Sequence, residues 1–337
     1  MPTIAIGNLA LDGGNVLEGV GLAYERSGNP DGPVILICHA LTGDQYAVGT
    51  DEAPGWWSRL AGPGKAVDTD KFQVICFNVL GGCNGSTGPQ SINPNTGTPY
   101  RSDFPLLTIR DMVRAEYQAL KILGIEKVKT VIGGSLGGMK ALEWGALYPD
   151  FAETIVPLAV NPAFTSYALA FNHISIQAIE HDPDFQKGNY GGSSDFKGFH
   201  LARMAGMISY RSGKLFNDRF GRTANGVNFE VESYLDYQGG KLARRFDANS
   251  YLILLKAMNS HDVGERKIAS PILSISFTHD LLYPAEGMVT WLQFQPEASW
   301  EVIETDFGHD GFLVEFEKWG GLIRKFLQKQ HQANAAQ

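Results

Sequence analysis

The sequence predicts an α/β protein with a mostly parallel central sheet and helices on both of its faces. Short apolar segments recur along the 337 residues, and helical patterns lie between several of them. Several of the short segments are nearly continuously apolar, which is typical of parallel strands covered on both faces. Strands that alternate with helices in this way indicate parallel pairing through helical crossovers.

Six segments have the length and composition of buried strands. They are Val34–Cys38, Gln73–Phe77, Thr130–Gly133, Thr154–Val160, Pro271–Phe277 and Trp300–Thr305. Three segments have helical patterns, namely Thr108–Leu123, Leu136–Tyr148 and Phe312–Gln328. Thr108 with Asp111 resembles a capping box, and Gly124 is placed where a helix ends. Residues His331–Gln337 are expected to form a frayed tail.

One region breaks this alternation. Residues 161–270 contain helical patterns and a Gly/Ser/Asn-rich stretch, GNYGGSS, but no clear strand. We therefore predict an α/β core formed by residues 1–160 and 271–337, and a helical lid insertion at 161–270 that covers the ends of the strands.

Composition excludes several classes of function. The formal net charge is −8 and no run of lysine and arginine occurs, so nucleic acid is not an expected partner. We see no signal peptide and no apolar run long enough to span a membrane. The cysteines Cys38, Cys76 and Cys83 are odd in number, and two lie in apolar runs, which favours reduced thiols and a cytoplasmic protein. No metal-ligand spacing appears, and no prosthetic group is expected.

The segment TVIGGSLGGMK contains Gly133-Gly134-Ser135-Leu136-Gly137, a G-x-S-x-G pattern between a predicted strand and a predicted helix. This is the nucleophile elbow of the α/β-hydrolase fold, in which glycines let the strand and the helix pass closely around an exposed serine. The alternative is a Gly-rich turn with an idle serine, but the strand–turn–helix context favours a nucleophile. We therefore predict the α/β-hydrolase fold with Ser135 as its nucleophile.

A serine hydroxyl requires a base, and in this fold the chain order is serine, acid, histidine. Among the histidines that follow Ser135, only His309 lies in a Gly-flanked loop between a late strand and the last helix. Asp280 follows the predicted strand Pro271–Phe277 and is the expected acid. Asp306, on the loop of the base itself, is the second choice, because the fold expects the acid at a separate strand end.

An oxyanion hole needs two backbone N–H groups. The residue after the nucleophile, Leu136, is one expected donor. The other is expected in the loop HALTG after the strand Val34–Cys38, and Leu41 is the candidate. His39 precedes the serine in the chain and is expected to be structural.

Several longer strings carry a family resemblance. They are HALTGDQYAVGT, PGWW, GPGKAVDTDKFQVICFNVLGGCNGSTGP, INPNTGTPY, DFPLLTIRDMVRAEYQALKILGI, GGSLGGMKALEWG and RFDANSYL. From about Tyr24 to Glu315 the chain resembles the homoserine O-acetyltransferases of methionine biosynthesis. NVLGGCNGSTGP and RFDANSYL are specific to that family and are not general features of α/β hydrolases.

The resemblance implies a ping-pong acyltransferase that uses acetyl-CoA and L-homoserine as substrates. Ser135, Asp280 and His309 fall on the family triad. Arg203 in LARMAG and Tyr210 in ISYRS resemble its substrate-binding pair, and Asp310 resembles its partner for the amino group. A zwitterionic amino acid needs a cation and an anion, and a guanidinium can pair bidentately with its carboxylate. The alternative for these charged residues is a salt bridge within the lid.

The resemblance also implies a homodimer, with helices in Asn161–Gln186 as candidate contacts. Three departures from the family leave the shape of the donor pocket open. The chain is shortened around Gly221–Val227, the acid segment reads THDLLYP rather than SDxLFP, and Gln45-Tyr46 stands where many members carry a histidine.

Three competing functions follow. The first is the same chemistry with succinyl-CoA as donor or serine as acceptor. The second is an esterase or thioesterase, against which Arg203 and Asp310 argue. The third is a binding module without activity, which the presence of all three triad candidates disfavours.

Overall fold

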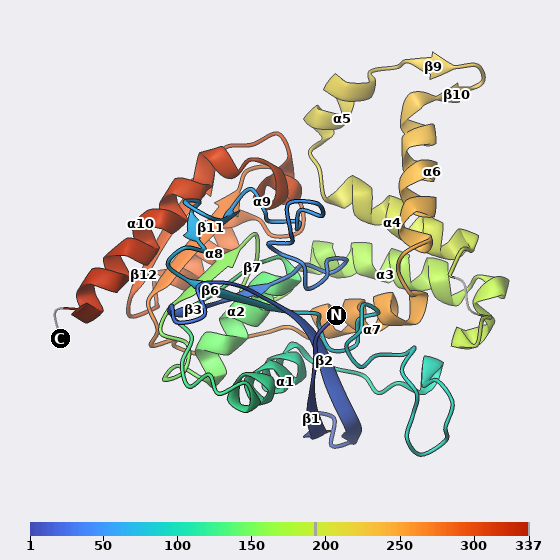
Figure 1. Cartoon of the computed structure of the whole chain (residues 1–337). Helices are drawn as coiled ribbons and strands as arrows, with labels where there is room; N and C mark the ends of the chain where they lie inside the picture. Colours follow the sequence, from blue (N-terminus) through green and yellow to red (C-terminus); the bar gives the residue numbers. More distant parts are fainter. Residues whose placement is uncertain (192–193, 336–337) are drawn as a thin grey trace.

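The computed structural model describes residues 1–191 and 194–335 of the chain. Its central sheet has eight strands in the order β1-β2-β6-β3-β7-β8-β11-β12 (Figure 1). Their bounds are β1 Thr3–Ala10, β2 Val16–Gly28, β3 Val34–Cys38, β6 Gln73–Phe77, β7 Thr130–Gly134, β8 Ile155–Leu158, β11 Ile272–Phe277 and β12 Ala298–Ile303. Neighbours from β6 to β12 pair in parallel, and β2 pairs antiparallel with β1 and β6. The predicted mostly parallel α/β-hydrolase sheet is confirmed.

The six predicted strands all occur, each within two residues at both ends, but β1 and β2 were not predicted. Only one face of this hairpin is buried, through Leu9, Leu17, Val20 and Leu22, and glycines interrupt both strands. Such strands lack the continuous apolar run that marks the interior of a parallel sheet. Two further short strands, β4 Ala61–Gly62 and β5 Val67–Asp68, pair outside the main sheet.

The helices agree with the predictions near the nucleophile and differ at the C-terminus. Helix α1 (Ile109–Ile122) begins at the predicted capping box, in which the Thr108 side chain accepts from the Asp111 backbone N–H. Helix α2 spans Leu136–Leu147. The predicted single helix Phe312–Gln328 is wrong, because α9 (Gly311–Val314) and α10 (Phe316–Ala335) are separated at Glu315.

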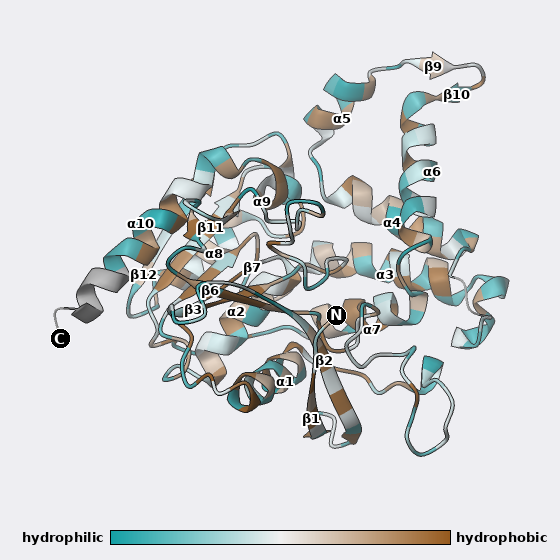
Figure 2. Cartoon of the chain, viewed as in Figure 1, coloured by the Kyte–Doolittle hydropathy of each residue, from teal (hydrophilic) through white to brown (hydrophobic). Residues whose placement is uncertain are grey.

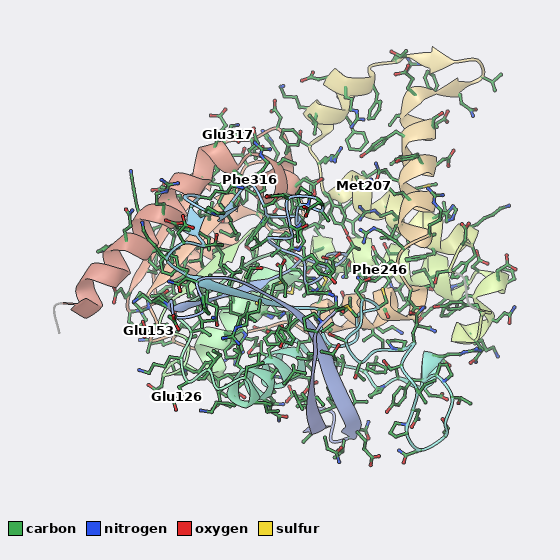
Figure 3. All side chains as sticks on the ribbon, in the orientation of Figure 1. Glu126, Glu153, Met207, Phe246, Phe316 and Glu317 are labelled. Carbon is green, nitrogen blue, oxygen red and sulfur yellow. The ribbon has the colours of Figure 1, made fainter. Side chains whose placement is uncertain are left out.

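Packing explains this break. Helix α9 turns Phe312 into the core, against the elbow residue Gly134, whereas α10 runs along the sheet with Trp319 buried beneath it. Figure 3 shows how the chain turns at this point, with Phe316 and Glu317 at the start of α10. Helix α10 also continues through residues 331–335, so the predicted frayed tail is wrong there; residues 336–337 lie outside the described residues.

Two apolar cores lie on the two faces of the sheet. Alternate residues of β3 contribute to different cores: Leu36 and Cys38 belong to one, and Ile35 and Ile37 to the other. Helices α1 and α2 cover the first face, and α10 covers the second. The inner strands β3, β6, β7, β8 and β11 are accordingly buried along their whole length and mainly apolar (Figure 2), as expected for strands covered on both faces.

Residues 161–270 contain mainly helices. They are α3 Ser166–Glu180, η2 Pro183–Gly188, α4 Lys197–Ser209, α5 Gly213–Phe220, α6 Glu230–Ala243 and α7 Ala248–Asn259. A two-residue hairpin, β9 (Ala224–Asn225) with β10 (Asn228–Phe229), joins α5 to α6 and was not predicted, since two residues carry no periodicity. Figure 1 shows α5, the hairpin and α6 as an arm that projects from the body. The division of the chain at 160/161 and 270/271 stays a prediction.

Helix α8 spans Ala285–Leu292, and the short 3-10 helices η1 and η3 span Arg101–Asp103 and Gly308–Asp310. The three cysteines are unpaired; Cys38 and Cys76 are buried in β3 and β6, and Cys83 is half-buried. Within the described residues, no helix is long and apolar enough to cross a membrane.

Candidate active site

Ser135 lies on a tight turn between β7 and α2, with φ of 58° and ψ of −123°. A non-glycine residue with this backbone conformation is strained, and such strain concentrates at functional sites. The neighbouring glycines are required by close packing. A Cβ on Gly137 would lie 2.1 Å from the Cys38 carbonyl oxygen, and one on Gly133 would lie 2.5 Å from the Gly137 carbonyl oxygen. The turn therefore presents the serine side chain at the carboxyl end of the sheet.

His309 and Asp280 approach each other from two separate segments. Asp280 follows β11, and its Oδ1 accepts hydrogen bonds from the backbone N–H groups of Leu282 and Tyr283, both at 2.9 Å. Its Oδ2 lies 2.7 Å from His309 Nδ1. Because Nδ1–H then donates to the carboxylate, the other ring nitrogen, Nε2, carries the free lone pair in the neutral imidazole.

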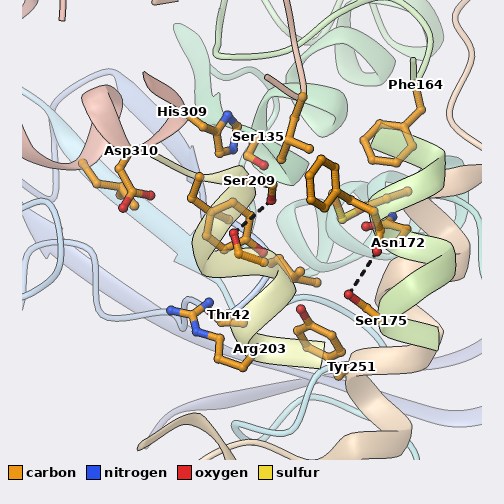
Figure 4. Close-up of a pocket in the computed structure, with 18 of the residues that line it drawn as sticks. Thr42, Ser135, Phe164, Asn172, Ser175, Arg203, Ser209, Tyr251, His309 and Asp310 are labelled. Carbon is orange, nitrogen blue, oxygen red and sulfur yellow. Dashed lines mark hydrogen bonds between the residues drawn. The ribbon is translucent and has the colours of Figure 1, made fainter. Parts of the chain in front are cut away.

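The surroundings of His309 affect its basicity. Burial alone lowers the pKa of the imidazole, but the charge and hydrogen bond of Asp280, together with the charge of Asp310, raise it above its usual value. The ring stacks on Tyr283, with centroids 5.1 Å apart, and meets Phe312 edge-on at 5.5 Å. These aromatic contacts fix the plane of the imidazole beside Ser135 (Figure 4). Among the described residues no hydrogen bond joins His309 to Ser135, and such bonds often tighten only when substrate is bound.

Asp306, the second choice for the acid, lies elsewhere. Its carboxylate is 45% exposed and accepts a hydrogen bond of 2.7 Å from Lys214 Nζ. The geometry thus brings Asp280, and not Asp306, into contact with the imidazole.

The loop after β3 contributes to the same pocket. His39 is buried; its Nδ1 lies 2.7 Å from the Ala40 carbonyl oxygen, and its Nε2 accepts from the Val79 N–H at 2.9 Å. Burial, followed by the charge of Lys140, lowers the pKa of His39 to about 3, so it is neutral and holds the loop in place. This agrees with the structural role expected of it.

The two expected oxyanion donors, Leu41 and Leu136, both have a backbone N–H without an acceptor among the described residues. Leu41 lines the pocket, and its N–H has no acceptor among the described residues. Leu136 is the first residue of α2, so its N–H has no carbonyl of the preceding turn to bind. A carbonyl oxygen bound at Ser135 would find both donors unoccupied.

One pocket contains most of the predicted residues. Ser135, His309, Asp310, Arg203, Tyr210 and Leu41 all line it. Figure 4 shows Ser135 and His309 at one end and Arg203 with Thr42 at the other. The guanidinium of Arg203 lies 5.6 Å from the centroid of the Tyr210 ring, and its Nε is buried without a hydrogen-bond partner among the described residues. No carboxylate there forms an ion pair with Arg203, so the alternative of a lid salt bridge does not hold for this residue.

Asp310 does form an ion pair, and its partner was not foreseen. Its Oδ2 accepts from Arg211 Nε at 2.9 Å. Arg211 stands beside Tyr210 in the string ISYRS, but nothing in the spacing signals where its side chain points. Only Oδ2 of this carboxylate is bound among the described residues, so Oδ1 is open to a cation in the pocket.

The rest of the lining comes from helices that the sequence did not identify as part of the site. It includes Phe164, Phe171, Asn172 and Ser175 at or in α3, Tyr251 and Met258 in α7, and Leu282 after β11. Only Tyr251 carried a signal, as part of RFDANSYL. Within the described residues no group of three or more metal-ligating side chains gathers. The arrangement is suited to forming an ester on Ser135 and passing its acyl group to a small polar acceptor.

Comparison with known proteins identifies relatives of this arrangement. The family model for the alpha/beta hydrolase fold matches residues 33–316. A homoserine O-acetyltransferase from Symbiobacterium thermophilum is 45% identical to the chain over 95% of its length and 92% of that protein. The crystal structure of a homoserine O-acetyltransferase from Bacillus anthracis has a TM-score of 0.91 at 28% identity, covering 97% of this chain and 96% of that one. The crystal structure of esterase E22 also has a TM-score of 0.91, at 27% identity, covering 97% and 99%.

Proposed function

This chain belongs to the homoserine O-acetyltransferases, a family of acyltransferases with the α/β-hydrolase fold, and from this premise we propose that it moves the acetyl group of acetyl-CoA to the hydroxyl of L-homoserine. The observation that carries the proposal is a single pocket with a nucleophile at one end and, at the other, the Arg203 guanidinium, which forms no ion pair within the described part of the chain. A bare esterase needs the first group but not the second. We place this reaction in methionine biosynthesis, the pathway implied by the family.

The first half-reaction acylates Ser135. His309 Nε2 removes the proton from the serine hydroxyl as the oxygen attacks the thioester carbonyl. The N–H groups of Leu41 and Leu136 hold the negative charge on the carbonyl oxygen, an effect worth about 3 kcal/mol per donor. The carbon–sulfur bond then breaks, CoA leaves with the proton from His309, and an acetyl ester remains on Ser135.

The second half-reaction returns the enzyme to its starting state. His309 removes the proton of the homoserine hydroxyl, the oxygen attacks the acetyl ester, and Ser135 regains its proton. Water must be kept from competing, so the acceptor hydroxyl has to be positioned and bulk solvent excluded. The residues of α3, α4 and α7 that line the pocket support this role.

Arg203 is proposed to bind the carboxylate of homoserine. We expect Arg203→Ala to raise the KM for homoserine about tenfold or more, because a charge-assisted pair in a partly enclosed site is lost. Acylation by acetyl-CoA should stay within about twofold of wild type, since no step of it requires this cation. Stopped-flow measurement of the CoA burst reports acylation, and the steady-state KM for homoserine reports binding of the acceptor. An equal loss in both half-reactions would rule out the substrate role.

The acetyl group is preferred over succinyl on grounds of charge. A succinyl chain carries a second carboxylate, and Arg203, the one arginine or lysine among the described lining residues, is assigned to the acceptor. Without a second cation, burial of that carboxylate would be costly.

The proposal is tested by CoA release, followed with a thiol reagent. Acetyl-CoA or succinyl-CoA is supplied with L-homoserine, L-serine or no acceptor. Sustained release, beyond the first equivalent per active site, that requires acetyl-CoA and homoserine together supports the proposal. Release that is indifferent to the acceptor would make the protein a hydrolase, the alternative favoured by the similarity to esterase E22. A preference for succinyl-CoA or serine would retain the mechanism and change the substrates.

We further propose a cytoplasmic homodimer. Helices α3 and α4 pack together and expose large apolar side chains seven residues apart: Tyr167 and Ile174 on α3, each 56% exposed, and Leu201 and Ile208 on α4. This spacing places each pair on one helix face. We expect a dimer in sedimentation velocity and a monomer for Ile174→Glu, because a buried unpaired carboxylate opposes association. Ile122→Glu on α1, at an equally exposed isoleucine, is the control; a wild-type monomer would contradict the proposal.

A further inference from the structure

Asp310, the carboxylate that the family resemblance assigns to the acceptor's amino group, already accepts a hydrogen bond at one of its two oxygens. Asp310 Oδ2 accepts from Arg211 Nε at 2.9 Å, and the side chains of Asp310 and Arg211 are only 14% and 21% exposed. Asp310 lines the pocket, whereas Arg211 does not. No hydrogen bond to Asp310 Oδ1 occurs among the described residues, so this second oxygen is the one available to a ligand.

Arg211 is also bound by a residue of the projecting arm, which consists of α5, the β9–β10 hairpin and α6. Its Nη1 donates to the Tyr234 hydroxyl of α6 at 2.9 Å, and its guanidinium lies 5.9 Å from the centroid of the same ring. Tyr234 in turn packs against Phe216 and Phe220 of α5, with ring centroids 6.1 Å and 5.0 Å apart. An arginine fixed at both Nε and Nη1 has little freedom to leave the carboxylate.

The segment that carries Arg211 is fastened to the turn that carries His309. The Asp310 N–H donates to the Tyr210 carbonyl at 3.0 Å, and Lys214 Nζ binds the Asp306 carboxylate. The Ser212 hydroxyl donates to the Asp306 carbonyl oxygen. These contacts hold the residues on either side of Arg211 against the turn 306–310 that carries His309.

The charges around the pocket cancel when Arg211 is counted. Two cations, Arg203 and Arg211, balance two anions, Asp280 and Asp310, when His309 is in the neutral form that acts as a base. A zwitterionic amino acid brings no net charge into such a site. Removing Arg211 would leave one excess negative charge next to the base.

We propose that Arg211 is a positioning residue for the acceptor amino acid, which orients the Asp310 carboxylate so that its free Oδ1 receives the substrate ammonium. This inference rests on the proposed function and extends it to a residue outside the pocket lining. Arg211 touches neither substrate nor the reacting atoms, and it acts through Asp310.

A second consequence concerns the base. Groups that face His309 are Asp280 and Tyr283 after β11, Asp310 on its own turn, Ser135 before α2, and Tyr210 at the end of α4; Arg203 lies at the other end of the pocket. The charge of Asp310 already raises the pKa of the imidazole, and Arg211 offsets that charge. Without the guanidinium the pKa should rise further. Because His309 accepts a proton only when neutral, the acid limb of the rate profile should then move to higher pH.

The experiment compares Arg211→Met, Arg211→Lys and a matched control, Arg219→Met. Arg219 of α5 places its guanidinium 4.8 Å from the centroid of the same Tyr234 ring but forms no ion pair with Asp310. We expect Arg211→Met to raise the KM for homoserine about tenfold or more while the KM for acetyl-CoA changes less than about twofold. The acid limb of kcat/KM should move up by about half a pH unit or more. Arg211→Lys keeps the charge, so its acid limb should lie at the wild-type pH. Its KM for homoserine should recover only in part.

The outcomes separate this inference from the proposed function. Sustained CoA release without any acceptor, beyond one equivalent per active site, in the wild type and every variant would remove the proposed function and this inference with it. Dependence on homoserine in the wild type, with Arg211→Met equal to Arg219→Met, would overturn the inference alone. Equal changes in the KM for homoserine and the KM for acetyl-CoA, with an acid limb at the wild-type pH, would also overturn the inference, because Arg211 would then have only a structural role. If Arg211→Met does not fold, Tyr234→Phe, which removes one hydroxyl, should still raise the homoserine KM about twofold; an unchanged KM would count against the inference.

Discussion

Ser135→Ala is expected to lower acetyl transfer by at least ~10⁴-fold, because loss of the nucleophile removes the covalent route in both half-reactions. The pocket, the unoccupied Leu41 and Leu136 N–H groups and Arg203 would remain, so substrate binding should survive. The measurement is twofold: steady-state CoA release with homoserine present, and mass spectrometry of the protein after incubation with acetyl-CoA alone. The wild type should gain one acetyl group on the peptide that contains Ser135, and the variant should gain none.

Ser209→Ala is the matched control for this variant. Ser209 also lines the pocket, but its hydroxyl donates to the Gly206 carbonyl of its own helix at 2.9 Å. Removal of this hydroxyl should change turnover less than about threefold, because it leaves no buried donor unpaired. Transfer that persists in Ser135→Ala would mean direct attack of homoserine on acetyl-CoA, and the covalent mechanism would have to be abandoned.

Asp280→Asn is expected to lower kcat by about 10⁴-fold with little effect on either KM. Asparagine keeps an oxygen for the Leu282 and Tyr283 N–H groups that Asp280 Oδ1 binds, so the turn after β11 should fold normally. The side-chain amide that replaces Oδ2 is a donor and cannot accept the His309 Nδ1–H. The imidazole would then adopt the other tautomer, with its Nε2 lone pair lost to the serine.

Asp306→Asn is the corresponding control on the loop of the base. Its carboxylate faces Lys214 at the surface, where solvent screens the ion pair and leaves it only a small contribution to stability. Most activity should therefore remain. If Asp306→Asn were inactive and Asp280→Asn active, the assignment of the acid would have to be exchanged.

The sequence predicted the interior of this fold better than its margins. The strands β3, β6, β7 and β11 are buried along their whole length, and none of them contains a charged residue. The hairpin β1–β2 is exposed on one side and interrupted by glycines, so no local pattern distinguishes it from a loop. The break at Glu315 depends on where Phe312 and Trp319 pack, which is a property of the assembled core.

The same distinction holds within the site. Ser135, Asp280 and His309 were predicted because each stands at a strand end or in a Gly-flanked turn whose order in the chain the fold dictates. Arg211 was not, because its role depends on a contact across 99 positions that leaves no periodicity. Phe171 and Met258 were missed for a similar reason, since an apolar residue that lines a pocket looks the same in sequence as one that fills a core.

The three unpaired cysteines bear on how the enzyme can be assayed. Thiol reagents react with thiolates, so a protein's own cysteines contribute a background only when they ionise. Burial raises the pKa of Cys38 to about 12 and that of Cys83 to about 11, and it raises that of Cys76 well above its usual value. At mildly alkaline pH all three should stay protonated, and two are shielded from solvent. A colorimetric reagent added to the folded enzyme should therefore report the CoA that is set free, almost without a signal from the catalyst.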